Sequence, residues 1–542
     1  MSSLDFNSHR ISRVSAGKLT VVVLLVLILG SWQADLAQSK ATRTKKLPSP
    51  EKIVDDYLKA IGGKKRIAQI RDATHDWTIT LKGQELGLAR TQYKAPGSFR
   101  ADLTFGNGKI ISGTNSSSAW VHGLDGQLHT LTGLEAATAR LQALLDANHL
   151  AGFKKRNVFA RTGVAWEDTT EPALVVEFST RGGARLRYLF DPIEKLLIQI
   201  EDEIRKTTVR FRDYRAVRDS GNILEPHQVV LNFGGQGELT LQLQEVAYNR
   251  QLPDSVFDPP SATETLDVAS LLREVGRNQE EVEKRVSEYA FVQTETDREL
   301  GGKGEVKKQT VKVYEVFPVA NSEPIMKLVS ENGVPLSAER AAKESKRVEE
   351  EFMKAERDRE RNQEKADRRL AEQKRKNLAA GKSEDDDPEL SQFLKVCEFV
   401  SPRRERFRDR DAVVFDFRPR PGFKPSNRQE SLISKLVGVV WIDPVDKQVM
   451  RLEARLSESF KMAGGLLFSV RPGAALAMEQ TRMTEGVWLP RLAQVNVSVK
   501  VLLFGGGDLN KTIEWSDYKH FKGDVGDYKL ESPKTEVPDK KP

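Results

Sequence analysis

Two copies of an Asp–Pro motif contain the residues of this chain that most invite a catalytic interpretation. The segment FDPIEKLLIQIE at 190–201 returns as IDPVDKQVMRLE at 442–453, and Asp191 and Asp443 are each followed by a lysine four positions later. A carboxylate beside an ammonium group could serve acid–base chemistry. An Asp–Pro pair is also typical of a turn, because the carboxylate bonds the backbone two residues on and proline presets φ. Turn chemistry accounts for the aspartates and solvent exposure for the lysines, so we interpret the motif as architectural.

Histidine, cysteine and glycine patterns provide no further catalytic or metal-binding candidate. No two of the seven histidines stand at metal-ligand spacing, and His122 and His129, which flank a Gly-rich turn, are expected at the surface. The single cysteine, Cys397, lies in an apolar stretch and is expected to be buried and inert. The Gly-rich segments 234–237 and 505–507 lie between alternating strands, which favours tight turns over phosphate loops. We therefore expect a protein that is not an enzyme and has no cofactor and no bound metal.

Composition excludes a nucleic-acid partner and indicates several domains. The 542 residues include 85 Lys and Arg against 78 Asp and Glu, and the two signs are interspersed. A basic face in contact with anionic lipid headgroups stays open as an alternative to an ordinary solvated surface. The length favours several domains of about 100–250 residues each.

The N-terminus has the pattern of an export signal. Arg10, Arg13 and Lys18 precede Leu19–Gly30, an apolar run with the length of a signal-peptide core and short for a membrane span. We expect a signal peptide at 1–39 and a mature chain in the periplasm, with an uncleaved inner-membrane anchor as the alternative. A basic linker is expected at 40–50.

Hydrophobic periodicity predicts an α+β fold with two antiparallel sheets, each with covering helices. The first domain is expected over 51–262. It begins with a helix whose face carries Ile53, Val54, Tyr57, Leu58 and Ile61, and it contains a second helix at about 133–148 among alternating strands. The second domain is expected over 264–524. It begins with a helix at about 266–287, and its strands include 393–400, 412–417 and 432–442.

Three matches in the same order suggest that the two domains are duplicates. The Asp–Pro corner is followed in the first domain by GNILEPHQVVLNF and in the second by EGVWLPRLAQVNV, which place Pro226 and Pro490 near a strand start. The segments LQEVAYN and IEWSDYKHF then end the two sheets.

A long charged helical insertion interrupts the second domain. Residues 337–380 are mostly charged and begin with an apolar stripe through Val348, Phe352 and Ala355 that fades after about two turns. We interpret this segment as a solvent-exposed helix. The alternative is an arm that binds a protein partner through a coiled coil. The tail at 525–542 is expected to be disordered.

Aromatic residues in or beside the predicted strands are candidates for the lining of a ligand cavity. A curved sheet under a long helix can enclose apolar space larger than its own side chains fill. A packed core explains each of these residues equally well. The candidates are Trp77, Phe99, Phe105, Trp120, Trp441 and Trp488.

The first domain resembles the LolA/LolB-like periplasmic lipoprotein-carrier superfamily. The similarity rests on IVDDYLKAIGG, RTQYKAPGSFRADL, SAWVHG and YNRQLPDSVFDPP within about 50–260, and more loosely on EGVWLP and WSDYKHF in the second domain. The chain is also similar to envelope proteins of unassigned function from soil-type bacteria, which share YEVFPV, SENGVPLSAE and WLPR. The resemblance implies half-open β-barrels with helical lids that hold the acyl chains of lipids or lipoproteins.

Two functions follow as hypotheses. The first is a periplasmic carrier that binds a lipid or an acylated lipoprotein, as in outer-membrane lipoprotein sorting. The second is an envelope scaffold or lipid-responsive sensor that binds a protein partner through the charged helix.

Overall fold

The computed structural model of the chain contains two units, each built on one large sheet. It describes residues 47–166, 172–261, 267–358, 388–462, 468–501 and 505–520 apart from 219, 235–236, 287, 303, 320–322 and 485, and it also places Glu364, Arg368 and Glu372. The expected signal peptide, most of the basic linker, most of the insertion after residue 358 and the C-terminal tail lie outside these residues. Within the part of the chain that the structure describes, no helix combines the length and the apolar character needed to cross a membrane.

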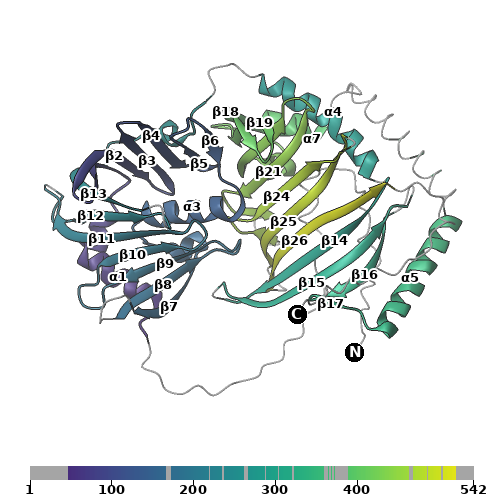
Figure 1. Ribbon diagram of the computed structural model, residues 1–542, viewed down its shortest axis with the longest axis horizontal. Helices are drawn as coiled ribbons and strands as arrows, with labels where there is room; N and C mark the ends of the chain where they lie inside the picture. Colours follow the sequence, from purple (N-terminus) through teal and green to yellow (C-terminus); the bar gives the residue numbers. More distant parts are fainter. Residues whose placement is uncertain are drawn as a thin grey trace, which may run out of the picture.

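The first unit begins with two short helices, and a longer helix separates its two groups of strands (Figure 1). In chain order its elements are α1 (Pro50–Ala60), α2 (Lys64–Ile67), β1 (Asp72–Leu81), β2 (Gln84–Lys94), β3 (Ser98–Phe105), β4 (Gly108–Thr114), β5 (Ala119–His122), β6 (Leu128–Thr130), α3 (Gly133–Asp146), the 3₁₀ helix η1 (Phe153–Arg156), β7 (Phe159–Trp166), β8 (Pro172–Ser179), β9 (Arg185–Phe190), β10 (Leu197–Asp202), β11 (Thr207–Ala216), β12 (Leu224–Asn232), β13 (Glu238–Tyr248) and the 3₁₀ helix η2 (Asp254–Phe257).

The first and the last strand of this unit are neighbours in its sheet. The strand order is β6-β5-β4-β3-β2-β1-β13-β12-β11-β10-β9-β8-β7, and Ala73 in β1 pairs antiparallel with Tyr248 in β13. Two meanders therefore extend in opposite directions from the central pair. Helix α3, which links them in the chain, contacts β3, β4 and β5 of one meander and β9 of the other, and it lies between them in Figure 1.

The second unit repeats this plan with a longer helical connection. Its elements are α4 (Val268–Val286), β14 (Tyr289–Leu300), β15 (Val306–Phe317), β16 (Ile325–Glu331), β17 (Val334–Pro335), α5 (Ala338–Arg357), α7 (Pro388–Val396), β18 (Cys397–Phe407), β19 (Arg410–Pro419), α8 (Arg428–Ile433), β20 (Leu436–Asp443), β21 (Gln448–Leu456), β22 (Phe460–Met462), β23 (Phe468–Val470), β24 (Ala475–Arg482), β25 (Trp488–Val501) and β26 (Gly505–His520).

The strand order of the second sheet matches the first strand by strand around the central pair. The order is β17-β16-β15-β14-β26-β25-β24-β21-β20-β19-β18, so β14 pairs with β26 as β1 pairs with β13. Pro226 in β12 and Pro490 in β25 lie on equivalent strands. The α+β assignment is confirmed, and among the described residues both sheets are open. An internal duplication predicts this agreement.

Both Asp–Pro corners have the expected turn chemistry. One carboxylate oxygen of Asp191 accepts the backbone N–H groups of Ile193 and Glu194, both at 2.6 Å. Asp443 binds the N–H groups of the two equivalent residues at 2.9 and 2.8 Å. The corners join β9 to β10 and β20 to β21, which occupy the same places in the two sheets. The architectural interpretation of the motif is therefore confirmed.

The first helix also agrees with its sequence signals. The hydroxyl group of Ser49 caps α1 by accepting the N–H of Lys52, and Pro50 occupies the first turn, where its missing N–H costs nothing. The buried residues of α1 belong to the main core of the unit, where Tyr57 packs edge-on against Phe190. This core lies between α1, α3 and strands β7–β10.

Two expected strands of the second unit begin later than predicted. Phe393 lies in helix α7 and Leu432 in helix α8, so the strands begin at Cys397 and Leu436. Short apolar runs do not distinguish a buried helix from a buried strand. The local signal was present for α8, because the side chain of Asn427 caps it by accepting the N–H of Glu430 at 2.9 Å. The sequence interpretation also missed β5, β6, β7, β16 and β24, together with the short strands β17, β22 and β23.

The described first half of the charged insertion is a helix packed on its own sheet. In α5, Val348 is 1% exposed and the Phe352 ring lies 5.9 Å from that of Phe317. Glu344 accepts the backbone N–H of Leu328 in β16 at 2.9 Å. The apolar stripe predicted from the sequence is thus used within the chain, and the outer surface of α5 is mostly charged.

A buried polar network joins the two units. Arg403 of β18 donates to Asp416 of β19 at 3.0 Å and to Glu405 at 2.8 Å. Glu405 in turn accepts the backbone N–H of Thr130, in the first unit, at 2.7 Å, and Asp416 accepts the hydroxyl group of Ser118 at 2.6 Å. We call these five residues the inter-unit network.

Candidate ligand-binding site

Apolar side chains from six adjacent strands of the first sheet gather on one of its faces. Side chains alternate along a strand, so every second residue of β1 points to this side. The buried members are Trp77, Ile79, Ala89, Val229 and Leu241, and the partly buried members are Leu103, Phe105, Val209, Phe211, Leu231, Leu239 and Leu243. We call this set the apolar face.

Helices cover the apolar face only in part. Val209 and Phe211 also pack at the margin of the core under α1 and α3, so one side of the face continues into that core. Away from the core, Leu103 and Phe105 remain partly exposed. Leu81 continues the same side of β1 and is 38% exposed. The face therefore runs from a closed core to solvent, as an amphiphile-binding surface requires.

A polar cluster lies where the apolar face meets the core. Nε2 of His75 in β1 is 3.5 Å from Oε1 of Glu225 in β12, and the hydroxyl group of Tyr248 in β13 donates to the same oxygen at 2.6 Å. Burial acts to raise the pKa of Glu225, but His75, His149 and Tyr248 together bring it below its ordinary value. Burial also raises the pKa of the Tyr248 phenol and lowers that of the His149 imidazole.

Three of the six aromatic candidates share this side of the sheet. Trp77 is 6% exposed, and its indole N–H donates to the Thr91 hydroxyl group at 3.0 Å. Phe105 is a partly buried member of the apolar face. Phe99 pairs across the strands with Tyr93, with ring centroids 5.1 Å apart. The structure thus brings Trp77, Phe99 and Phe105 onto one surface.

Trp120 lies on the opposite face of the same sheet. Trp120 pairs with Gly113, and the next residue of β4, Thr114, pairs with Phe99. Because successive residues of a strand point to opposite faces, Trp120 and Phe99 lie on opposite faces of the sheet. Trp120 is fully buried, and its indole N–H donates to the carbonyl of Phe257 in η2 at 3.3 Å. It therefore anchors the segment that closes the first unit.

Trp441 and Trp488 form a separate cluster in the second unit. They pack with Val414, Val439 and Met450 and with Val286 at the end of α4, whereas Leu272 and Val275 of α4 pack on the other face of these strands. The indole N–H of Trp488 donates to Asp446 at 2.9 Å. Neither residue touches the apolar face of the first sheet, so the six candidates do not form one site.

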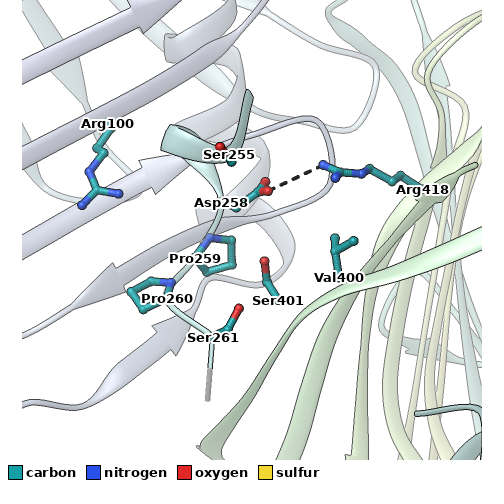
Figure 2. Close-up of a pocket in the computed structure, with 9 residues that line it drawn as sticks. All are labelled: Arg100, Ser255, Asp258, Pro259, Pro260, Ser261, Val400, Ser401 and Arg418. Carbon is teal, nitrogen blue, oxygen red and sulfur yellow. Dashed lines mark ion pairs between the residues drawn. The ribbon is translucent and has the colours of Figure 1, made fainter. Parts of the chain in front are cut away.

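A pocket of ≈ 550 Å³ lies between the two units and is lined by both (Figure 2). Its charged side chains are bound to protein groups. Nη1 of Arg418 is 3.7 Å from Asp258, and its Nε donates to Glu398 at 2.6 Å. Arg100 donates to Asp102 at 2.7 Å and to the carbonyl of Val256 at 2.9 Å. Because these charges are already matched, the pocket is a weaker candidate than the apolar face.

The polar cluster was missed by the sequence interpretation. His75 precedes Trp77 by two residues, so strand alternation alone places both on one face. Glu225 and Tyr248 lie far along the chain, and only the β1–β13–β12 order brings them to His75. Among the described residues, no group of three or more histidine, cysteine or acidic side chains is arranged to hold a metal ion.

No protein-family model matches the chain, and no curated protein matches it. Solved structures do match. A LolA superfamily protein from Nitrosomonas europaea is 15% identical, with 39% of this chain and 99% of that chain covered and a TM-score of 0.27. An outer membrane lipoprotein-sorting protein domain from Vibrio parahaemolyticus is 11% identical, with 38% and 97% covered and a TM-score of 0.26.

A third similar structure is the complex of MucA and MucB from Pseudomonas aeruginosa. It is 9% identical, covers 85% of this chain and 94% of that chain, and has a TM-score of 0.18. The first match carries the name of the superfamily that the sequence motifs resemble. At TM-scores of 0.27 and below, we draw no function from these similarities.

Proposed function

We propose that the chain binds the acyl chain of a lipid or of an acylated lipoprotein on the apolar face, without catalysis. The observation that carries the proposal is the half-covered state of this face. Within it, Trp77 and Ile79 are buried, while Leu103 and Phe105 are left partly exposed. A large apolar surface that reaches solvent marks a binding site more often than a core.

The energetics suit an acyl ligand. Each methylene buried against such a surface contributes about 0.8 kcal/mol, so a dozen would supply about 10 kcal/mol before the cost of ordering the ligand. The partly exposed Leu103, Leu231 and Leu239 offer aliphatic contacts to such a chain. We further propose that the protein acts in the periplasm, as its N-terminal sequence suggests, and that its two units arose by duplication.

A protein-binding role for the charged helix has less support. The apolar residues Val348 and Phe352 of α5 are already packed on the second sheet. Exposed charges alone are the ordinary surface of a solvated helix. The scaffold or sensor function therefore stays an alternative that lipid binding does not require.

The first test is lipid binding by the purified chain from Lys40 onward. Solvent extraction followed by mass spectrometry would identify a co-purified lipid, and titration with a fluorescent fatty acid would give an affinity. We expect a bound lipid and saturable uptake of the probe. The absence of both would overturn the proposal.

A matched pair of variants locates the site. Leu103→Asp places a charge on the apolar face, whereas Leu88→Asp places one on the opposite side of the neighbouring strand β2, where Leu88 is 59% exposed. We expect probe affinity to fall at least about tenfold in Leu103→Asp and to stay unchanged in Leu88→Asp. Circular dichroism would confirm that both are folded. Equal affinity in the two variants would place the site elsewhere.

A further inference from the structure

His75 occupies an unusual position beside the apolar face. It is 7% exposed, and its ring stacks on that of Trp77 with centroids 5.8 Å apart and planes at 18°. The Tyr93 ring stands perpendicular to it at 6.0 Å. An acyl chain laid along the apolar face would therefore end at this imidazole.

Within the described part of the chain, one nitrogen of this imidazole has no hydrogen-bond partner. Nε2 faces Glu225, but Nδ1 is buried and has no hydrogen-bond partner among the described residues. Buried polar atoms in folded proteins are nearly always hydrogen-bonded, because an unsatisfied one retains its full desolvation cost. A site with an apolar approach and one unsatisfied polar atom is complementary to an amphiphile that brings the missing hydrogen bond.

The partners of Glu225 define which hydrogen bond is missing. In the neutral tautomer that donates Nε2–H to Glu225, Nδ1 carries a lone pair and accepts a hydrogen bond. The ligand must therefore supply an O–H or N–H donor. Glu225 is bound by His75 and Tyr248, and the described residues give it no lysine or arginine partner. A second negative charge beside it would be buried without compensation, which disfavours a carboxylate or phosphate.

We propose that His75 and Glu225 form a recognition site for an uncharged acyl lipid that carries an O–H or N–H donor next to its chain. This inference rests on the proposed binding of acyl chains to the apolar face and adds the chemistry of the ligand's head. Nδ1 is covered in the structure, so the ligand reaches it after a neighbouring side chain rotates. The half-buried Tyr93 ring lies beside the imidazole.

Three ligands with the same C18:1 chain test the head chemistry at pH 8. Monoolein carries hydroxyl donors, methyl oleate carries none, and oleate is anionic. We expect monoolein to displace a fluorescent probe at about tenfold lower concentration than methyl oleate or oleate, since one hydrogen bond is worth about this factor. Equal displacement by monoolein and methyl oleate, or strongest displacement by oleate, would overturn this inference alone. Binding of none of the three would overturn the proposed function as well.

Substitutions assign the preference to His75. In His75→Phe we expect the monoolein preference to disappear, so that monoolein and methyl oleate displace the probe at similar concentrations. His122→Phe is the matched control. Nδ1 of His122 also has no hydrogen-bond partner in the part of the chain that the structure describes, but the residue lies on the opposite face, beside Trp120 in β5. A preference that survives in His75→Phe, or disappears in His122→Phe, would contradict the assignment.

A measurement on the unchanged chain keeps the inference testable if His75→Phe does not fold. With ¹⁵N-labelled histidine, the Nδ1 resonance of one buried imidazole should shift on addition of monoolein and stay in place with methyl oleate. An unchanged spectrum at saturating monoolein would overturn the inference.

Discussion

The hydroxyl group of Ser118 in the first unit donates a 2.6 Å hydrogen bond to the carboxylate of Asp416 in the second, and both side chains are completely buried. The other oxygen of that carboxylate accepts from Arg403, which is 1% exposed. A buried ion pair with a hydroxyl donor from the other unit fixes one relative position of the two sheets. This is the most specific contact of the inter-unit network.

Asp416→Ala should strongly destabilise the protein. It leaves the guanidinium of Arg403 with one carboxylate fewer in a buried site, which typically costs about 3–5 kcal/mol of unfolding free energy. Urea denaturation followed by tryptophan fluorescence would measure the loss. Asp411→Ala, at an exposed position of the same strand, is the control and should change stability by less than about 0.5 kcal/mol. Similar losses in both variants would show that the network contributes nothing specific.

The two Asp–Pro corners should differ in their sensitivity to alanine. Asp191→Ala removes two hydrogen bonds to turn N–H groups and should cost about 1–2 kcal/mol. Asp443 makes the same two bonds and also accepts a hydrogen bond from Nε of Arg410 at 2.6 Å. Its side chain is only 1% exposed. Asp443→Ala should therefore cost about 3 kcal/mol or more. The midpoints of thermal unfolding of the two variants would measure the difference. A larger fall in the midpoint for Asp191→Ala than for Asp443→Ala would contradict this prediction.

Acid should remove part of the contribution of Asp443. Burial acts to raise its pKa, but the hydrogen bonds from Arg410 and from the turn N–H groups outweigh burial and leave the pKa below its ordinary value. The unfolded state then binds a proton at a higher pH than the folded state, so this contribution is full above about pH 4 and is lost as the pH falls through the folded pKa. The difference in unfolding free energy between the unchanged chain and Asp443→Asn should therefore shrink on acidification below pH 4. A constant difference across that range would refute it.

The thiol of Cys397 should be unreactive toward thiol reagents in the folded protein. The residue is fully buried, and burial raises the pKa of its thiol to about 12 despite the opposing charge of Arg420. Reaction with a thiol reagent at pH 8 needs both access and thiolate. We expect no modification within hours in native buffer and one equivalent in guanidinium chloride. Rapid reaction of the native chain would show that β18 opens.

Gly438→Ala should disrupt the second sheet. A Cβ at this position would lie 2.0 Å from the carbonyl oxygen of Glu453 and 2.5 Å from the ring of Phe417. The carbonyl belongs to the backbone of the paired strand β21, so it cannot move without shifting that strand. We expect a loss of at least about 2 kcal/mol or failure to fold. Gly106→Ala is the control, because its Cβ would meet nothing within 4 Å. Equal thermal stability of the two variants would contradict the close approach of β20 and β21.

Local signals predicted the elements of this chain better than its site. The Asp–Pro pairs predicted two turns, and Ser49 and Pro50 are local signals for the start of α1, because such signals act within a few residues. Phe393 and Leu432 were assigned to strands because four or five apolar residues suit a buried helix equally well.

The site depends on contacts that no local pattern contains. Trp77 and Phe105 were identified as candidates because aromatic residues in strands are conspicuous. Glu225 reaches His75 only through the pairing of β1 with β13 and of β13 with β12, which is a property of the whole unit. The separation of Trp441 and Trp488 from the apolar face follows likewise from their place in a different sheet.

The pairing of the first strand with the last in each unit has a kinetic consequence. Ala73 meets Tyr248, and Tyr289 meets His520, so the central strand pair of each sheet closes a loop that contains nearly the entire unit. Closing so long a loop has a large entropic cost, and this cost arises before the favourable contacts of the strand pair have formed. We therefore expect slow and highly cooperative folding. A chain that ends before Gly505 would leave β14 and β25 with open edges, ready to pair with other chains. A nascent or truncated chain therefore remains prone to aggregation until its final strand arrives.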